Sequence, residues 1–329
     1  MPAMRDDSAS APARPAWLAR LRLPIFAAPM FLLSGPDMVV AAVQAGIVGA
    51  FPTTNARTSE DLERWLVDIT TRIEAGRPRD PAQPYGTWAA NLVTHSTNPR
   101  LKRDLELLAE YQPPIVITAL GGPQPVIETV HGYGGLVIAD VNSVPFARKA
   151  AAAGADALLL VASGAGAHTG QMSPFAFVDS VREFWDGLLV LSGAMSTGRA
   201  IRAALTLGAD MASIGTRFIA TPECMAHPEY KQMVLDSGFE DIVCTNAFTG
   251  AWANMLRPSI VRVGLDPDNL GPGRRLDVTA DPHAGNRAWK DIWAAGHGVG
   301  VVRRQQTLAE VVDQLAREFA AAKLQLEGE

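Results

Sequence analysis

The sequence predicts a (β/α)8 barrel, the TIM-barrel fold class, with an added, mostly helical lobe after the eighth strand. Eight short apolar runs follow one another, and a helical stretch separates most of them. Most of these runs are continuously apolar, which is typical of parallel strands covered on both faces. Eight such units in succession favour a closed barrel. A doubly wound open sheet is the alternative, but "AAPMFLLSG" after the first strand lacks the glycine-rich fingerprint of that fold.

The apolar runs define the expected strands, in chain order. They are Pro24–Pro29, Ile47–Phe51, Gly86–Asn91, Ile115–Ala119, Leu136–Asp140, Ala157–Val161, Leu188–Ser192 and Met211–Gly215. Helices are expected between them. Thr58 and Asp61 have the spacing of a capping box, so they predict where one helix begins. A second helix is expected over Ser196–Leu207, and an amphipathic helix over Thr307–Phe319 closes the fold.

Glycines join several helix ends to the strands that follow. The segments "AVQAGIVGAF", "AAAAGADALLLV" and "LTLGADMASIG" form a weak internal repeat of this kind. Gly46, Gly154 and Gly208 are therefore predicted to be helix C-caps, because a left-handed residue that turns the chain back toward the sheet is most often glycine.

The chain is expected to divide into four parts. They are a loose tail over residues 1–16, the barrel over 17–220, a lobe over the active site at 221–289, and a segment at 290–329 that returns to the barrel. The lobe is inferred from a break in the strand–helix rhythm. This break includes the Gly/Pro/Asp-rich run "GLDPDNLGPGRRLD".

Composition excludes several classes of function. Of 329 residues, 48% are hydrophobic and 19% are charged, so the chain can bury a large core. The net charge of −5 argues against a nucleic-acid or anionic-membrane partner, since both require a basic face. No apolar run approaches the ~20 residues of a membrane helix. No heptad repeat marks an oligomer interface, so the oligomeric state stays open.

The cysteine and histidine positions predict no metal site. Cys224 and Cys244 belong to no Cys-x-x-Cys pattern, and no pair of histidines has metal-ligand spacing. The two cysteines fit a reduced cytoplasm, and we expect a cytoplasmic protein. Cys224 is interpreted as a packing thiol, with a nucleophile as the alternative.

The ends of the strands are where chemistry is expected, because active sites of such barrels lie there. The sixth strand runs into "SGAGAHTG", in which His168 is the titratable side chain. Imidazole titrates nearest neutrality, so His168 is suited to proton transfer or to hydrogen bonding with an anion. A structural histidine in a tight loop is the alternative.

The loops after the seventh and eighth strands predict a phosphate site. Backbone N–H groups in these two loops commonly hold phosphate in such barrels. Gly193, Ala194, Gly215 and Thr216 occupy these loops. Arg217 either adds positive charge there or pairs on the surface. The alternative is that both loops are merely tight turns.

Two further strand ends carry side chains suited to a flat ring. Met30 ends the first strand and can flank a ring, or else pack in the core. Asn91 ends the third strand, and its amide both donates and accepts hydrogen bonds. Each of these signals is weak by itself.

Together these segments resemble the nitronate monooxygenase (2-nitropropane dioxygenase-like) family. The resemblance rests on "PIFAAPM", "AN", "AGAHTG", "LSGAMSTGRAI", "GADMASIGTRFIAT", "EYK" and "WAAGHGVGVV", and it runs from about Pro24 to Val302. Their order and spacing are fairly specific as a set.

The resemblance implies an FMN-binding barrel with a helical lobe over the flavin. It implies that Met30, with Ala28 and Pro29, and Asn91 contact the isoalloxazine. Gly193 with Ser192 and Ala194, and Gly215 with Thr216, are then the phosphate-binding residues. His168 matches the family's active-site histidine, a base or hydrogen-bonding partner of the substrate anion. In the family FMN oxidises a nitronate and O2 reoxidises the flavin.

The sequence also departs from the family pattern. Ala167 replaces a glycine of the "AGGHxG" motif, and His297 stands where Gln is expected. These departures leave the physiological substrate open. The alternatives are an FMN-dependent NAD(P)H reductase, of the quinone or enoyl-ACP reductase kind, and a non-catalytic protein that binds a flavin or another phosphate-containing ligand.

Overall fold

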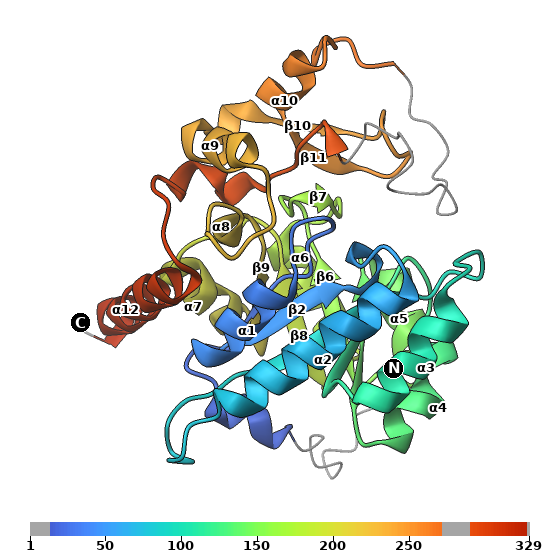
Figure 1. Ribbon diagram of the computed structural model, residues 1–329. Coiled ribbons are helices and arrows are strands. Elements are labelled where there is room, and N and C mark those ends of the chain that lie inside the picture. Colours follow the sequence, from blue (N-terminus) through green and yellow to red (C-terminus); the bar gives the residue numbers. More distant parts are fainter. Residues whose placement is uncertain (1–13, 272–289, 328–329) are drawn as a thin grey trace, which may run out of the picture.

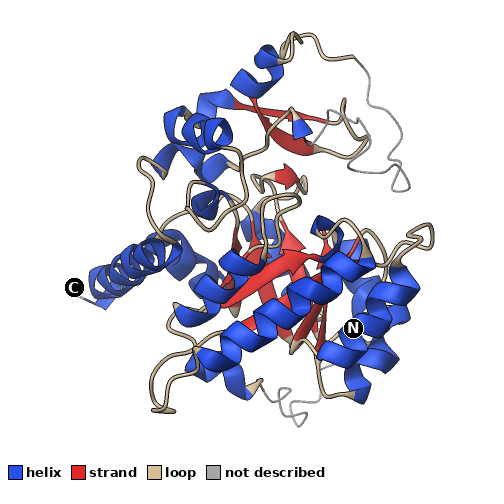
Figure 2. Cartoon of the chain, viewed as in Figure 1, coloured by secondary structure: helices blue, strands red, loops and turns tan. Residues whose placement is uncertain are grey.

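The computed structural model describes residues 14–271 and 290–327 and contains a closed eight-stranded parallel barrel (Figures 1 and 2). The strands pair in the order β1-β2-β3-β4-β5-β6-β8-β9, and β9 closes the barrel onto β1. Their bounds are β1 Ile25–Ala27, β2 Val48–Pro52, β3 Thr87–Val93, β4 Ile115–Ala119, β5 Leu136–Val141, β6 Ala157–Val161, β8 Leu188–Ser192 and β9 Met211–Ile214. The predicted fold class is confirmed, and the open-sheet alternative is excluded.

Helices surround the barrel and cover the outer faces of its strands (Figure 2). They are α1 Pro36–Gln44, α2 Ser59–Ala75, α3 Leu101–Tyr111, α4 Gln124–Gly132, α5 Val144–Ala152, α6 Pro174–Arg182, α7 Gly198–Leu207 and α8 Thr216–Ile219. A 3-10 turn at Ala16–Arg20 precedes β1, and another, η2, at Thr53–Asn55 follows β2. The predicted tail over residues 1–16 lies mostly outside the described residues.

Local signals in the sequence placed these elements well. Thr58 caps α2, and its side chain and that of Asp61 form the reciprocal bonds of a capping box. The three glycines predicted to end helices all have positive φ, at 82° for Gly46, 89° for Gly154 and 113° for Gly208. Such φ values are costly for residues with a side chain, which explains why glycine occurs at these turns.

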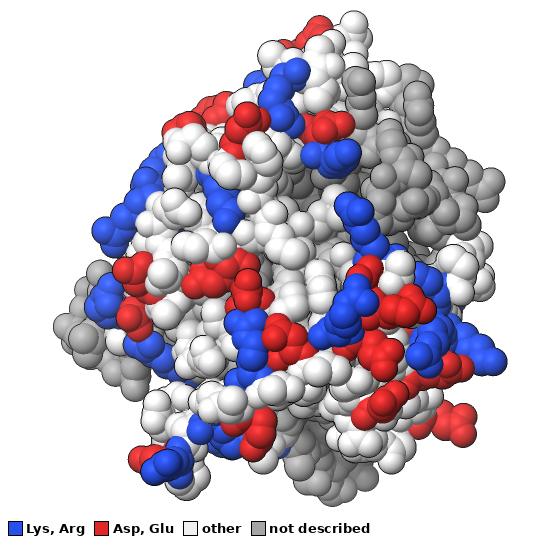
Figure 3. Space-filling model, in the orientation of Figure 1, with Lys and Arg blue, Asp and Glu red and all other residues white. Residues whose placement is uncertain are grey.

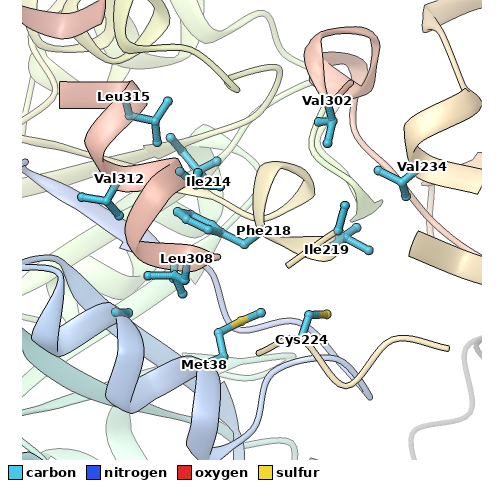
Figure 4. Packing of buried hydrophobic residues seen from close by; sticks show 14 of the residues in the cluster. Met38, Ile214, Phe218, Ile219, Cys224, Val234, Val302, Leu308, Val312 and Leu315 are labelled. Carbon is cyan, nitrogen blue, oxygen red and sulfur yellow. The ribbon is translucent and has the colours of Figure 1, made fainter. Parts of the chain in front are cut away.

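The C-terminal helix α12, Leu308–Glu327, packs against α7 and α1 on one side of the barrel (Figure 1). Its buried side chains Leu308, Val312 and Leu315 point toward Phe218 of α8 and Ile214 of β9 (Figure 4). The helix therefore secures the segment that follows the last barrel strand, next to the predicted phosphate loops.

The lobe lies over one end of the barrel (Figure 1). It contains α9 Pro228–Asp236, a 3-10 turn, η3, at Phe239–Asp241, and α10 Arg257–Arg262. The lobe also contains an antiparallel hairpin that the sequence analysis did not predict, formed by β10 Ile242–Thr245 and β11 Ala253–Leu256. A final segment returns through η4 His297–Val301 to α12.

The hairpin is joined to the barrel by a short strand, β7 Ala167–His168, that comes from the loop after β6. The register pairs Ala253 with His168 and Asn254 with Ala167. In Figure 1, β7 lies between the hairpin and the barrel. The lobe therefore holds the backbone of the predicted active-site histidine.

The described part of the chain has no helix that is long and apolar enough to cross a bilayer. The same residues contain no group of three or more His, Cys, Asp or Glu side chains placed to hold a metal ion. On the face drawn in Figure 3, Lys and Arg are interspersed with Asp and Glu and form no continuous basic patch. Cys224 is buried, and burial raises its pKa to about 11, so the thiol stays protonated as expected of a packing residue.

Candidate functional site

A cavity of about 1600 Å³ opens at the carboxyl ends of the barrel strands, beneath the lobe. All ten residues that the sequence analysis placed in the site line this cavity. They are Ala28, Pro29, Met30, Asn91, His168, Ser192, Gly193, Ala194, Gly215 and Thr216. The residues come from five different strand ends, so the barrel topology alone brings them together.

The floor of the cavity is the uppermost layer of side chains inside the barrel. Below it, Ile138, Leu159, Val190 and other apolar side chains fill the barrel interior. Side chains alternate along a strand, so the residue two positions after each of these apolar residues also points into the barrel, one layer nearer the carboxyl ends of the strands. The residues of this layer are Ala28, Pro52, Asn91, Ala119, Asp140, Val161, Ser192 and Ser213, and all eight line the cavity. The floor is therefore made of small and polar groups on a rigid, closed sheet.

His168 lies where the barrel loop meets the lobe. Its Nε2 is 3.3 Å from the Oγ1 of Thr249, which belongs to the turn between β10 and β11. The Thr249 hydroxyl can donate to the carbonyl oxygen of Ala251 (3.2 Å) and accept from Nε2–H, or it can donate to Nε2, and the tautomer of His168 decides between the two.

Burial lowers the pKa of His168 below its ordinary value. Desolvation disfavours the imidazolium ion, so the side chain is neutral at pH 7. A neutral imidazole can take a proton or hydrogen-bond to an acidic group. The environment of His168 is therefore suited to the base role that the sequence indicated.

The loop before His168 is held by unusual backbone conformations. Gly164 has a φ of 84° and Ala167 a φ of 58°, both in the left-handed region. The carbonyl oxygen of Gly164 accepts from the N–H of Ala194 (3.1 Å) and of His297 (3.0 Å). Three loops that are far apart in the sequence thus meet at one carbonyl group.

The Ala167 conformation predicts that Ala167→Gly stabilises the protein by about 0.5–1 kcal/mol. A left-handed alanine costs more than a left-handed glycine, although glycine loses more chain entropy on folding. Urea unfolding of the two proteins measures the difference. Ala165→Gly is the matched control, because Ala165 is a nearby buried alanine whose φ is not positive, so glycine there should destabilise. A destabilised Ala167→Gly protein contradicts the prediction.

The two predicted phosphate loops lie side by side at the end of β8 and β9. Gly193 has a φ of 130°, and an added Cβ would lie 2.8 Å from the carbonyl oxygen of Ser163. The N–H of Ala194 already donates to Gly164, so any role of Ala194 depends on backbone shape rather than on that N–H. Thr216 Oγ1 accepts from the N–H of Gly296 (2.8 Å), which leaves its own hydrogen to donate.

Arg217 takes neither of the positions that the sequence analysis considered. It is 3% exposed and does not line the cavity. Its Nη2 donates to the Oε1 of Gln306 (2.8 Å) and of Gln314 (3.0 Å). Arg217 therefore connects α8 to α12 and to the segment before it.

Arg217→Ala should lower the free energy of unfolding by about 2 kcal/mol, because the buried Gln306 and the partly buried Gln314 lose a charged donor. It should leave the affinity for FMN, the cofactor expected from the sequence, unchanged, since the guanidinium does not reach the cavity. Chemical denaturation and FMN titration measure the two quantities. The exposed Arg304, as Arg304→Ala, provides the control for loss of one positive charge. A loss of FMN affinity confined to Arg217→Ala would instead support a phosphate role.

His297, the second departure from the family pattern, packs behind the His168 loop. Its ring meets that of Phe239 edge-on, with 5.0 Å between centroids. An added Cβ on Gly164 would lie 2.9 Å from His297 Nδ1. The neighbouring Gly296 and Gly298 line the cavity. His297 therefore shapes the loop next to the site.

Sequence reasoning missed one ionisable group in the floor of the cavity, Asp140. The signal was present in "LVIADV", where a single acid follows an apolar strand two positions after the inward Ile138. It also missed the lobe residues Phe248, Thr249 and Trp252, which line the cavity from above. No local pattern marks these three residues, because they reach the site through the β7–β11 pairing.

A closed parallel barrel with a large cavity at the carboxyl ends of its strands, covered by a lobe, defines the class of TIM-barrel enzymes. A family model described as "Nitronate monooxygenase" matches residues 16–318. The chain therefore belongs to the nitronate monooxygenase family of flavin-dependent oxidoreductases.

Individual relatives agree with this family. A nitronate monooxygenase of Paraburkholderia phytofirmans is 28% identical and is matched over 92% of this chain and 94% of its own length. Rv1533 of Mycobacterium tuberculosis, a monooxygenase by name, is 31% identical over 229 residues. That alignment spans 65% of this chain and 61% of the relative.

Solved structures share the fold. The nitroalkane oxidase of Streptomyces ansochromogenes superposes with a TM-score of 0.78 at 24% identity, over 95% of this chain and 100% of the other. FabK of Thermotoga maritima superposes with a TM-score of 0.75 at 22% identity, over 96% of this chain and 99% of the other. At these identities the two superpositions establish the architecture.

Proposed function

We propose that this protein uses FMN to oxidise small alkyl nitronates with O2, and that His168 is the base or hydrogen-bonding partner of the substrate anion. The observation that carries the proposal is the position of His168. It lies at the junction of barrel and lobe and lines a cavity whose floor consists of small and polar side chains. A family match over residues 16–318 supports the same chemistry.

The residues present fit FMN. The cavity of about 1600 Å³ exceeds the ~300–1000 Å³ of ordinary ligand pockets, so it has room for a cofactor and a small substrate. Small residues would let a flat ring approach the floor closely, and Met30 and Asn91 would contact the ring. The loops at Gly193 and Gly215 would hold the phosphate. When bound, FMN supplies the electron acceptor for the oxidation.

His168 would supply the local chemistry for the substrate. A neutral imidazole can take the acidic α-proton of a nitroalkane or donate a hydrogen bond to the anionic nitro group of a nitronate. The Thr249 hydroxyl and the β7–β11 pairing hold the ring in place, and fixed geometry is worth several kcal/mol in such steps. Phe248 and Trp252 of the lobe would exclude water from above.

Anaerobic mixing of the purified protein with propyl nitronate, and separately with NADH and NADPH, tests the proposal. A yellow protein whose flavin absorbance is bleached by the nitronate, and recovers when air is admitted, is the expected result. Bleaching by NADH or NADPH alone would assign the protein to the reductases instead. A colourless protein that FMN does not reconstitute would overturn both assignments.

A further inference from the structure

The floor of the cavity contains an ionisable group, Asp140, that the proposed reaction does not use. It is the next-to-last residue of β5 and points into the barrel mouth from the same layer as Asn91 and Ser192. Across residues 14–271 and 290–327, no hydrogen bond or ion pair reaches its carboxyl group. The carboxyl group is partly exposed in the cavity, so a bound ligand can reach it and form a hydrogen bond with it.

The topology of the barrel places Asp140 across the mouth from the predicted phosphate loops. Going round the sheet, β8 and β9 lie opposite β3 and β4, and β5 is next to β4. A ligand held by its phosphate above β8 and β9 would reach Asn91 on β3 and Asp140 on β5 with its ring. The Nδ2 of Asn91 donates to the carbonyl oxygen of Ile117 (3.2 Å). The Oδ1 of Asn91 and the carboxylate of Asp140 are thus two acceptors on the side of the cavity opposite the phosphate loops.

Few other charges face this carboxyl group. The adjoining strands β4 and β6 contain no titratable residue, as their sequences IVITA and ALLLV make plain. Among the described residues, the titratable side chains that line the cavity besides Asp140 are Arg57, Arg100, Lys149, His168 and Tyr230. Arg100 is bound to the buried Asp104, and the Tyr230 hydroxyl donates to the Ala294 carbonyl oxygen.

We propose that Asp140 recognises the ring of the cofactor, as a carboxylate that accepts a hydrogen bond from an imide N–H such as that of an isoalloxazine. The inference rests on the proposed use of FMN. It adds a residue that selects for the ring, separate from those expected at the phosphate. Because the bound ring favours the ionised form of Asp140, binding must release the proton that the apoprotein retains.

Proton release on binding tests the assignment without any turnover. Apoprotein is titrated with FMN by calorimetry at pH 7, in two buffers of different ionisation enthalpy, which yields the protons released per ligand. Burial raises the pKa of Asp140 to about 7. The wild type should therefore release about half a proton more than Asp140→Asn. The phosphate of FMN also titrates, with a pKa of about 6, but it contributes equally to both proteins.

Two controls separate Asp140 from its neighbours. Asn91→Ala removes a floor residue that does not titrate, so it should weaken binding without changing proton release. Riboflavin, which has the ring but no phosphate, should show the same difference between wild type and Asp140→Asn. In the wild type the Kd of riboflavin should fall about four-fold from pH 6.5 to pH 8.5, as Asp140 ionises.

The outcomes are distinct. Equal proton release from wild type and Asp140→Asn, with FMN bound by both, overturns the role of Asp140 and leaves the proposed function intact. A wild type that binds neither FMN nor riboflavin overturns both proposals. If Asp140→Asn does not fold, the riboflavin series in the wild type decides, because a Kd that does not change between pH 6.5 and 8.5 overturns the assignment.

Discussion

His168→Ala should lower kcat for propyl nitronate by about 10²- to 10³-fold, the range for loss of one positioned hydrogen-bond donor to a charged oxygen. FMN should still bind, because His168 is not among the residues expected at the phosphate or beneath the ring. The free energy of unfolding should change little, since the backbone pairing of β7 with β11 does not require the imidazole. Stopped-flow reduction by the nitronate, with FMN affinity measured separately, tests both parts.

Thr249→Val is the matched variant for this experiment. It removes the hydroxyl that lies 3.3 Å from Nε2 but leaves the imidazole in place. A smaller loss than in His168→Ala, about 10-fold in kcat with little change in FMN affinity, is expected of a positioning residue. Normal nitronate turnover by His168→Ala would show that another group performs the chemistry and would reduce His168 to a structural residue.

The sequence predicted the barrel well because its signals are local. Each buried parallel strand is a continuous apolar run, and three of them, Ile115–Ala119, Ala157–Val161 and Leu188–Ser192, have the bounds expected from the sequence. Capping at Thr58 and the left-handed glycines likewise depend on a few neighbouring residues. Once the barrel is known, its geometry requires that the strand ends converge, which is why the expected site residues line one cavity.

The lobe was harder to predict because its structure depends on contacts between distant segments. The strands β10 and β11 have four residues each, and β11 pairs with a two-residue strand more than eighty positions earlier in the chain. Such short strands have little periodicity of their own, and pairing decides their conformation. The residues that the hairpin brings over the cavity could not be found by inspecting neighbours in the sequence.

Arg217 and Asp140 illustrate a second limit, which concerns the direction of side chains. Both follow apolar strands, and both are charged. Arg217 points away from the cavity toward α12, whereas Asp140 points into it. Two-residue alternation along β5 is enough to place Asp140 in the barrel interior, but the irregular turn into α8 provides no such rule. A charge near a strand end therefore indicates a site only where its strand register is known.

Asp140→Asn should make the apoprotein more stable at pH 8, by on the order of 3 kcal/mol. Burial raises the pKa of this carboxyl from 3.8 to about 7. A rise of one unit in the pKa on folding corresponds to a loss of about 1.4 kcal/mol of stability for the ionised protein. Water in the open cavity screens the carboxylate, so the expected loss is smaller than the whole pKa change would give. In the unfolded chain the group ionises near pH 4, whereas in the folded chain it keeps its proton until about pH 7. The wild type therefore loses stability as the pH rises from 4 to 7.

The isosteric amide does not titrate, so the stability difference between the two proteins should be near zero at pH 4, grow up to pH 7 and stay constant above it. Urea unfolding at pH 4, 5.5, 7 and 8 measures this curve. Asp156→Asn is the control, because Asp156 is a carboxylate whose Oδ2 is bound to His131 and to the N–H of Val137, and its loss should destabilise. With saturating FMN at pH 8, the wild type should become the more stable of the two proteins, because the ring forms a stronger hydrogen bond with the carboxylate than with the amide. A stability difference independent of pH would mean that Asp140 is already ionised and solvated in the apoprotein.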